Sequence, residues 1–110
     1  MVLELQRRED LDQLIEKSKA HPVLIFKHST QCPVSDAAYE EFLAFSEKAG
    51  DVDSGVVLVI ENRALSNAIE SHFGVRHESP QAIVVRNGHK TWSASHWSIT
   101  VDALEKALRG

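Results

Sequence analysis

The chain has 110 residues, which suits one domain with a real hydrophobic core. Its 43% hydrophobic and 25% charged residues are typical of a soluble globular protein. The net charge of −4 provides no basic surface, so nucleic acid is not an expected partner. The apolar runs are too short to span a bilayer, and the charged N-terminus does not resemble a secretory signal. We therefore expect a cytoplasmic protein that does not bind membranes.

Hydrophobic periodicity predicts strands and helices in alternation. The expected elements are a strand at residues 2–5, a helix at 8–20, a strand at 23–27, a helix at 33–49, a strand at 56–60, a helix at 63–73, a strand at 81–86, its return strand at 89–93 and a helix from residue 101. Residues 51–55 are expected to form a loop. Asn87-Gly88 is a strong hairpin signal, and Thr100 is the expected N-cap of the last helix, between the staple residues Ile99 and Leu104.

The element order is therefore β-α-β-α-β-α-β-β-α. Strands joined by helical crossovers are expected to be parallel, whereas the hairpin is antiparallel. The prediction is one α/β domain over residues 1–110, with a mixed central sheet flanked by helices.

Cys32 is the only cysteine, and it lies where the strand at residues 23–27 leads into the next helix. Pro33 follows it, and proline is favoured at the first helical position because its missing N–H would have no partner there. Cys32 is thus the expected N-cap, with its sulfur facing the free N–H groups of Val34 and Ser35. These donors and the helix dipole favour a thiolate over a thiol. We therefore expect a reactive cysteine, although a lone cysteine can also be an inert buried residue.

Three neighbouring side chains could assist Cys32. His28, as an imidazolium, could stabilise the thiolate, or it could point away at the end of the strand. Alternation sends Lys27 to the opposite face, so only one of the two is expected to help. Ser35 lies about one helical turn from Cys32 and could hydrogen-bond its sulfur. The six histidines show no zinc-ligand spacing, so no metal site is expected.

Residues 27–35, Lys-His-Ser-Thr-Gln-Cys-Pro-Val-Ser, together with Ser95-His96-Trp97, resemble the YtxJ-like proteins, the monothiol bacilliredoxins. Nearly the whole chain shares this resemblance, and residues 72–81 resemble the corresponding part of the wider thioredoxin superfamily. The chain departs from dithiol thioredoxins at two positions. Ser35 replaces the second cysteine of the C-x-x-C motif, and Phe26 replaces a buried acid.

The resemblance implies a thioredoxin-like fold in which the Ser79–Pro80 bond is cis and faces Cys32. It also implies that Cys32, Ser35 and His28 form the catalytic group. The substrate-binding residues are expected to be Thr30, Pro33, Ser79, Pro80 and Trp97.

The expected activity is monothiol thiol–disulfide exchange, in which Cys32 removes bacillithiol or a similar small thiol from modified proteins. No permanently bound cofactor is expected, since the small thiol is a co-substrate, and an external thiol or a reductase must regenerate Cys32. If the thiol is bacillithiol, its carboxylates require cations, and Lys27, His28, Arg76 and His77 are the nearest in sequence.

Two alternatives belong to other classes. Monothiol glutaredoxins also carry C-x-x-S and can share an iron–sulfur cluster between two chains, although Pro33 stands where their motif has glycine. A thioredoxin-like interaction protein would not use its cysteine at all. A peroxiredoxin is disfavoured, because position 29 is serine where the matching threonine would be required.

Overall fold

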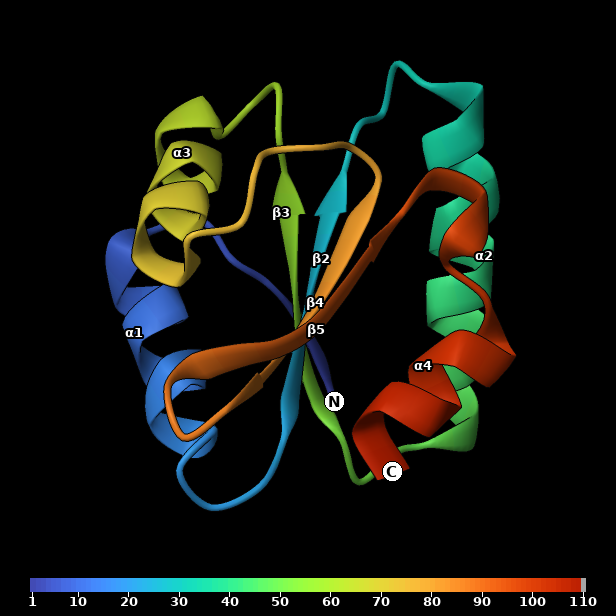
Figure 1. The fold of residues 1–110 in the computed structure, drawn as a ribbon. Helices are drawn as coiled ribbons and strands as arrows, with labels where there is room; N and C mark the ends of the chain where they lie inside the picture. The colour runs from blue at the N-terminus through green and yellow to red at the C-terminus, as the bar shows by residue number, and fades with distance from the viewer. Residues whose placement is uncertain (110) are drawn as a thin grey trace.

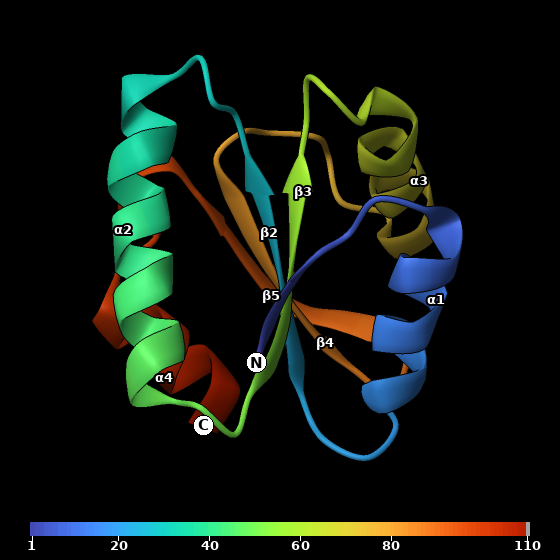
Figure 2. The same ribbon diagram turned by 180° about the vertical axis from the view of Figure 1, so that it is seen from behind.

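The computed structural model describes residues 1–109, which form a five-stranded sheet between two layers of helices (Figure 1). The elements are β1 (Val2–Glu4), α1 (Arg8–Lys17), β2 (Val23–His28), α2 (Pro33–Lys48), β3 (Asp53–Leu58), α3 (Arg63–Phe73), β4 (Gln81–Arg86), β5 (His89–Ser95), the short 3-10 helix η1 (His96–Ser98) and α4 (Val101–Arg109). Helices α1 and α3 cover one face of the sheet, and α2 and α4 cover the other (Figure 2). The expected α/β architecture is confirmed. The expected domain, residues 1–110, includes Gly110, which lies outside the described residues.

The strand order is β1-β3-β2-β4-β5. Strands β1 and β2 run parallel to β3, whereas β4 runs antiparallel to both of its neighbours, β2 and β5. The mixed sheet is confirmed, but the expectation that every helical crossover joins parallel strands is wrong for β4. Residues 74–80, called the Pro80 loop below, bring the chain back to the end of the sheet at which α3 began (Figure 1). The loop thereby enters β4 at the end where β2 finishes.

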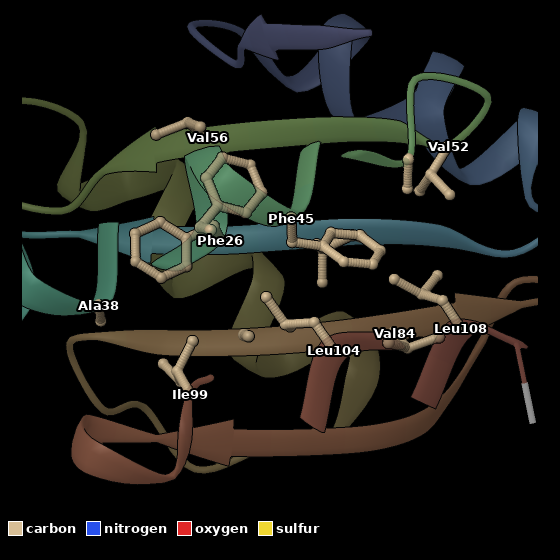
Figure 3. Close-up of a cluster of buried hydrophobic side chains, with 13 residues drawn as sticks. Phe26, Ala38, Phe45, Val52, Val56, Val84, Ile99, Leu104 and Leu108 are labelled. Atoms are coloured by element: carbon tan, nitrogen blue, oxygen red, sulfur yellow. The ribbon is translucent and has the colours of Figure 1, made fainter. Parts of the chain in front are cut away.

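Strand β2 is central, and each of its six residues is buried. Alternation sends Leu24 and Phe26 into the core under α2 and α4, which also contains Phe45 and Leu104 (Figure 3). Val23 and Ile25 point to the opposite face, into a second core under α1 and α3. The strand therefore lies between two apolar layers.

Strand β3 begins earlier than expected, at Asp53, and ends at Leu58. The expected loop at residues 51–55 is wrong because residues 53–55 pair in parallel with β2 and residues 54–55 also pair with β1, and this long-range pairing overrides their local turn composition. Ile60 consequently lies beyond the strand and is 48% exposed.

Other boundaries differ by a few residues. Helix α1 ends at Lys17, β5 continues to Ser95, and α2 ends at Lys48. Leu43 of α2 lies outside the buried face of the helix and is 40% exposed.

The hairpin turn at Asn87-Gly88 and the Thr100 cap are confirmed. Asn87 and Gly88 both have positive φ, as the expected two-residue hairpin requires. Thr100 Oγ1 accepts a hydrogen bond from the Ala103 N–H at 3.1 Å, and both Ile99 and Leu104 are buried beside it.

Candidate active site

Cys32 is the N-cap of α2 and Pro33 is its first residue, as expected. The Cys32 backbone is extended (φ −125°, ψ 119°), and its carbonyl oxygen accepts the Asp36 N–H at 3.1 Å, the first hydrogen bond of the helix. Its side chain is half-buried. Within residues 1–109 the sulfur makes no capping hydrogen bond, so the expected contact with the N–H groups of the first turn is wrong. The sulfur thus remains free to meet a substrate at the positive end of the helix.

Ser35 connects α2 to the end of β2. Its side chain is fully buried, and its Oγ accepts the Ser29 backbone N–H at 2.9 Å and lies 2.7 Å from His28 Nδ1. The described residues contain no hydrogen bond between Ser35 and the Cys32 sulfur, so the expected direct contact is not formed. The hydroxyl instead fixes the turn that carries Cys32.

His28 is buried and packed among aromatic rings. It stacks on Tyr39 with ring centroids 4.4 Å apart and an interplanar angle of 15°, and it also stacks on Phe26. Burial lowers the pKa of His28 below its ordinary value, although the carboxylates of Asp36 and Glu61 oppose the shift. This shift favours the neutral ring over the imidazolium, which was one of the two alternatives for His28. A neutral imidazole can exchange a hydrogen bond with Ser35 in either direction.

Gln81, the first residue of β4, pairs with Lys27 near the end of β2, so the Pro80 loop reaches the end of the sheet that also carries the β2–α2 turn (Figures 1 and 2). The Ser79–Pro80 bond is cis, as the resemblance implied. Pro80 is buried, and its carbonyl oxygen accepts the His96 N–H at 3.1 Å, which connects the loop to the start of η1. Ser79 is half-buried, and its hydroxyl oxygen is buried without a hydrogen-bond partner in the described part of the chain.

The remaining predicted site residues are exposed. Thr30 and Pro33 flank Cys32 along the chain, and Thr30 Oγ1 lies 3.4 Å from Glu61 Oε2 in the β3–α3 connection. Trp97 is 72% exposed and borders a hollow of about 290 Å³ beside the first turns of α2, together with Ala37 and Glu41. Trp97 thus lies beside α2.

Two residues near this end were not recognised from the sequence. Ile60 was assigned to a strand, but it is exposed in the connection that also carries Glu61. Lys27 was considered as a cation for a ligand, but it is fully buried under α3. Lys27 and His28 are therefore unable to meet the charges of a substrate, whereas Arg76 and His77 are exposed.

Among residues 1–109, no group of three histidine, cysteine or carboxylate side chains is placed to hold a metal ion. Over the same residues, no helix combines the length and apolar character that crossing a membrane requires.

The chain is similar to known proteins over most of its length. A family model described as monothiol bacilliredoxin BrxC matches residues 3–104. A solved structure of a candidate oxidoreductase with a thioredoxin fold shares 36% identity and a TM-score of 0.88, over 96% of this chain and 92% of the other. Thioredoxin from Fasciola hepatica shares 16% identity, with a TM-score of 0.79 over 99% of this chain and 97% of the other. Schistosoma mansoni thioredoxin shares 21% identity, with a TM-score of 0.78 over 98% and 95%.

The two thioredoxins show the fold alone, since their identities are low. The family match covers most of the chain and agrees with a single cysteine at the helix N-terminus and a serine three residues later. The chain belongs to the monothiol bacilliredoxin family and is a thiol–disulfide oxidoreductase with a thioredoxin fold.

Proposed function

We propose that Cys32 removes bacillithiol from mixed disulfides on proteins. The observation that carries this proposal is the pairing of a half-buried Cys32 at the N-terminus of α2 with a fully buried Ser35. Ser35 stands where dithiol thioredoxins have their second cysteine, and its hydroxyl is bound to His28 and Ser29. The chain can therefore take a thiol onto Cys32, but it has no second sulfur to displace it.

The chemical step is one thiol–disulfide exchange. The Cys32 thiolate attacks the bacillithiol sulfur of the mixed disulfide, a new S–S bond forms, and the bond to the protein substrate breaks. The protein substrate leaves as a thiolate and takes a proton from water. One S–S bond forms and one breaks, so the step involves no net oxidation. The N–H groups of Val34 and Ser35 and the dipole of α2 favour the negative charge on sulfur at the start of the step.

Turnover then depends on another molecule. A free thiol or a partner reductase attacks the mixed disulfide on Cys32 and releases bacillithiol. We place this cycle in the cytoplasm, where thiols are kept reduced. The partners are accordingly bacillithiolated proteins and the reducing thiol.

Ser35 and His28 support the nucleophile indirectly. Ser35 Oγ accepts a hydrogen bond from the Ser29 N–H, and it accepts a second one from His28 when His28 Nδ1 carries the hydrogen. In the other tautomer the hydroxyl donates to His28 Nδ1. In either tautomer Ser35 holds the turn that carries Cys32, and no imidazolium is required.

The substrate is proposed to lie across the exposed residues around Cys32. Thr30 and Pro33 flank Cys32 along the chain, while Ser79 offers its backbone groups beside Pro80 in the neighbouring loop. Trp97 forms the far border beside α2. For the carboxylates of bacillithiol, Arg76 is the exposed cation of the Pro80 loop.

The test mixes the reduced protein with a bacillithiolated protein and follows both intact masses. We expect the adduct to appear on Cys32 as the substrate is freed. The Cys32→Ser variant should show neither event, because a hydroxyl is not a nucleophile toward disulfides.

Ser35→Ala should lower the rate by no more than about tenfold, the equivalent of one hydrogen bond. Ser46→Ala is its matched control, since Ser46 lies on the same helix and its hydroxyl has no partner among residues 1–109. If the substrate is not released, or is released equally by Cys32→Ser, the exchange proposal is wrong. A brown anaerobic preparation would then support an iron–sulfur module instead.

A further inference from the structure

Lys27 is a fully buried lysine on the face of β2 opposite His28. It pairs with Val57 on one side and Gln81 on the other, and its side chain extends under α3. An ammonium group in an apolar core is unfavourable unless a partner accepts its hydrogen bonds. Replacing such a group with a hydrophobic residue is often neutral or stabilising, so stability alone does not explain a lysine here.

The partner is in the Pro80 loop. Lys27 Nζ lies 3.2 Å from His77 Nδ1. Since an ammonium only donates, the histidine nitrogen must accept, and the His77 ring is then neutral. Burial and the Lys27 charge both lower the pKa of His77, which agrees with this assignment.

Helix α3 holds the same histidine from the other side. Glu70 Oε2 accepts the His77 backbone N–H at 2.6 Å, and Ser66 Oγ lies 3.4 Å from His77 Nδ1. The remaining charges that act on the His77 ring are Arg63 on α3 and Glu78 in the loop. His77 is thus hydrogen-bonded at both its ring and its backbone.

A second contact fixes the residue before His77. Gln81, which pairs with Lys27 across the sheet, donates from Nε2 to the Arg76 carbonyl oxygen at 3.0 Å. Lys27 and Gln81, neighbours on adjacent strands, therefore hold consecutive residues of the loop. Ser79 and Pro80 lie two and three residues after His77, in the same loop.

We propose that Lys27 is a positioning residue that holds the Pro80 loop, through His77, in the place where it receives the disulfide substrate of Cys32. This inference rests on the proposed exchange at Cys32. Lys27 itself is buried and touches neither the substrate nor the sulfur. It acts from the opposite face of the sheet, through a loop that reaches the catalytic end.

The anchor carries a pH dependence. Burial lowers the pKa of Lys27 to about 8, and Glu70 opposes the shift. As pH rises through this value Lys27 loses its charge, and its hydrogen bond to His77 weakens. Transfer from a protein disulfide should then fall, while the reaction of Cys32 with a small alkylating reagent, which does not use the loop, should not.

The experiment has a structural arm and a kinetic arm. In the structural arm, NMR follows the Lys27 Cε signal and the carbon-bound protons of Val75 and His77 with pH. We expect the loop signals to titrate with the Lys27 midpoint in wild type and to lose this step in Lys27→Met. Lys90→Met, a change of an exposed strand lysine, is the matched control and should keep it.

In the kinetic arm, single-turnover transfer from a bacillithiolated peptide should be slowed about tenfold or more in Lys27→Met and His77→Ala, through loss of alignment. His77→Gln, which retains an acceptor, should recover most of the rate. Iodoacetamide alkylation of Cys32 should stay within about twofold of wild type in every variant, because the helix N-terminus that activates the sulfur is unchanged. Circular dichroism would verify that each variant is folded. If Lys27→Met does not fold, His77→Ala tests the same contact.

The positioning role is wrong if folded Lys27→Met or His77→Ala transfers bacillithiol at the wild-type rate. It is also wrong if the loop signals do not titrate with the Lys27 midpoint. If wild type transfers no bacillithiol at all, the exchange proposal fails. The NMR titration then still decides whether Lys27 holds the loop, so the two failures are distinguishable.

Discussion

Lys27 and His28 are consecutive residues of β2, and both are buried, yet they serve opposite faces of the sheet. His28 packs as a neutral aromatic ring against Tyr39 and bonds Ser35 of α2. Lys27 extends a buried amine to His77 in the Pro80 loop. Because side chains alternate along a strand, one short segment braces both the turn that carries Cys32 and the loop that ends in Pro80.

The two contacts, His28 with Ser35 and Lys27 with His77, are called braces here, and they differ in their energetics. The ring of His28 contributes buried apolar contact, so its removal leaves a cavity. The amine of Lys27 carries a charge whose burial is unfavourable, so its removal costs little or nothing in stability. The comparison predicts that one brace stabilises the fold and that the other mainly orders a loop.

The largest effect is expected for His28→Ala. Loss of a buried, stacked ring should lower the free energy of unfolding by roughly 3 to 4 kcal/mol, in the range of large-to-small aromatic changes. Urea denaturation measures it, with Lys27→Met as the companion variant. If Lys27→Met is destabilised as much as His28→Ala, the claim that Lys27 contributes little to stability is wrong.

The second effect is the alkaline dependence of stability that comes from Lys27. Its folded pKa of about 8 is below the ordinary 10.5. The unfolded chain therefore binds more protons between these two values, and the free energy of unfolding should rise with pH across that window. Below about pH 8 both states are protonated and the dependence disappears.

The rise should be on the order of 2 kcal/mol after allowance for solvent screening. Urea denaturation of wild type and Lys27→Met at several pH values isolates it, since the other titrating groups are shared. Parallel curves for the two proteins would show that Lys27 has an ordinary pKa in the fold.

The smallest effect is expected for Ser35→Ala. This change leaves the Ser29 N–H and His28 Nδ1 without their partner, which should lower the free energy of unfolding by about 1 to 2 kcal/mol. Ser46→Ala, on the same helix, breaks no hydrogen bond within residues 1–109 and should be nearly neutral. Equal losses in both variants would mean that the His28 brace does not depend on its hydrogen bond to Ser35.

Local signals predicted much of this molecule. The apolar run of β2, the proline at the start of α2, the Asn87-Gly88 turn and the Thr100 cap each act over a few residues, and each formed as expected. The boundaries of β3 were missed, because Asp53 and Gly55 have turn character and become a strand only by pairing with β1 and β2.

The sequence by itself determined that a lone cysteine begins a helix after a buried strand, with serine in place of a second sulfur. That information is local, because helix capping and strand burial are decided within one or two turns of chain. Only the tertiary structure decided what surrounds the cysteine. The reversal of β4, the aromatic packing that keeps His28 neutral and the contact of Lys27 with a residue 50 positions away all depend on how distant segments meet. Such contacts arise from burial and shape complementarity across the whole core, which no short stretch of sequence encodes.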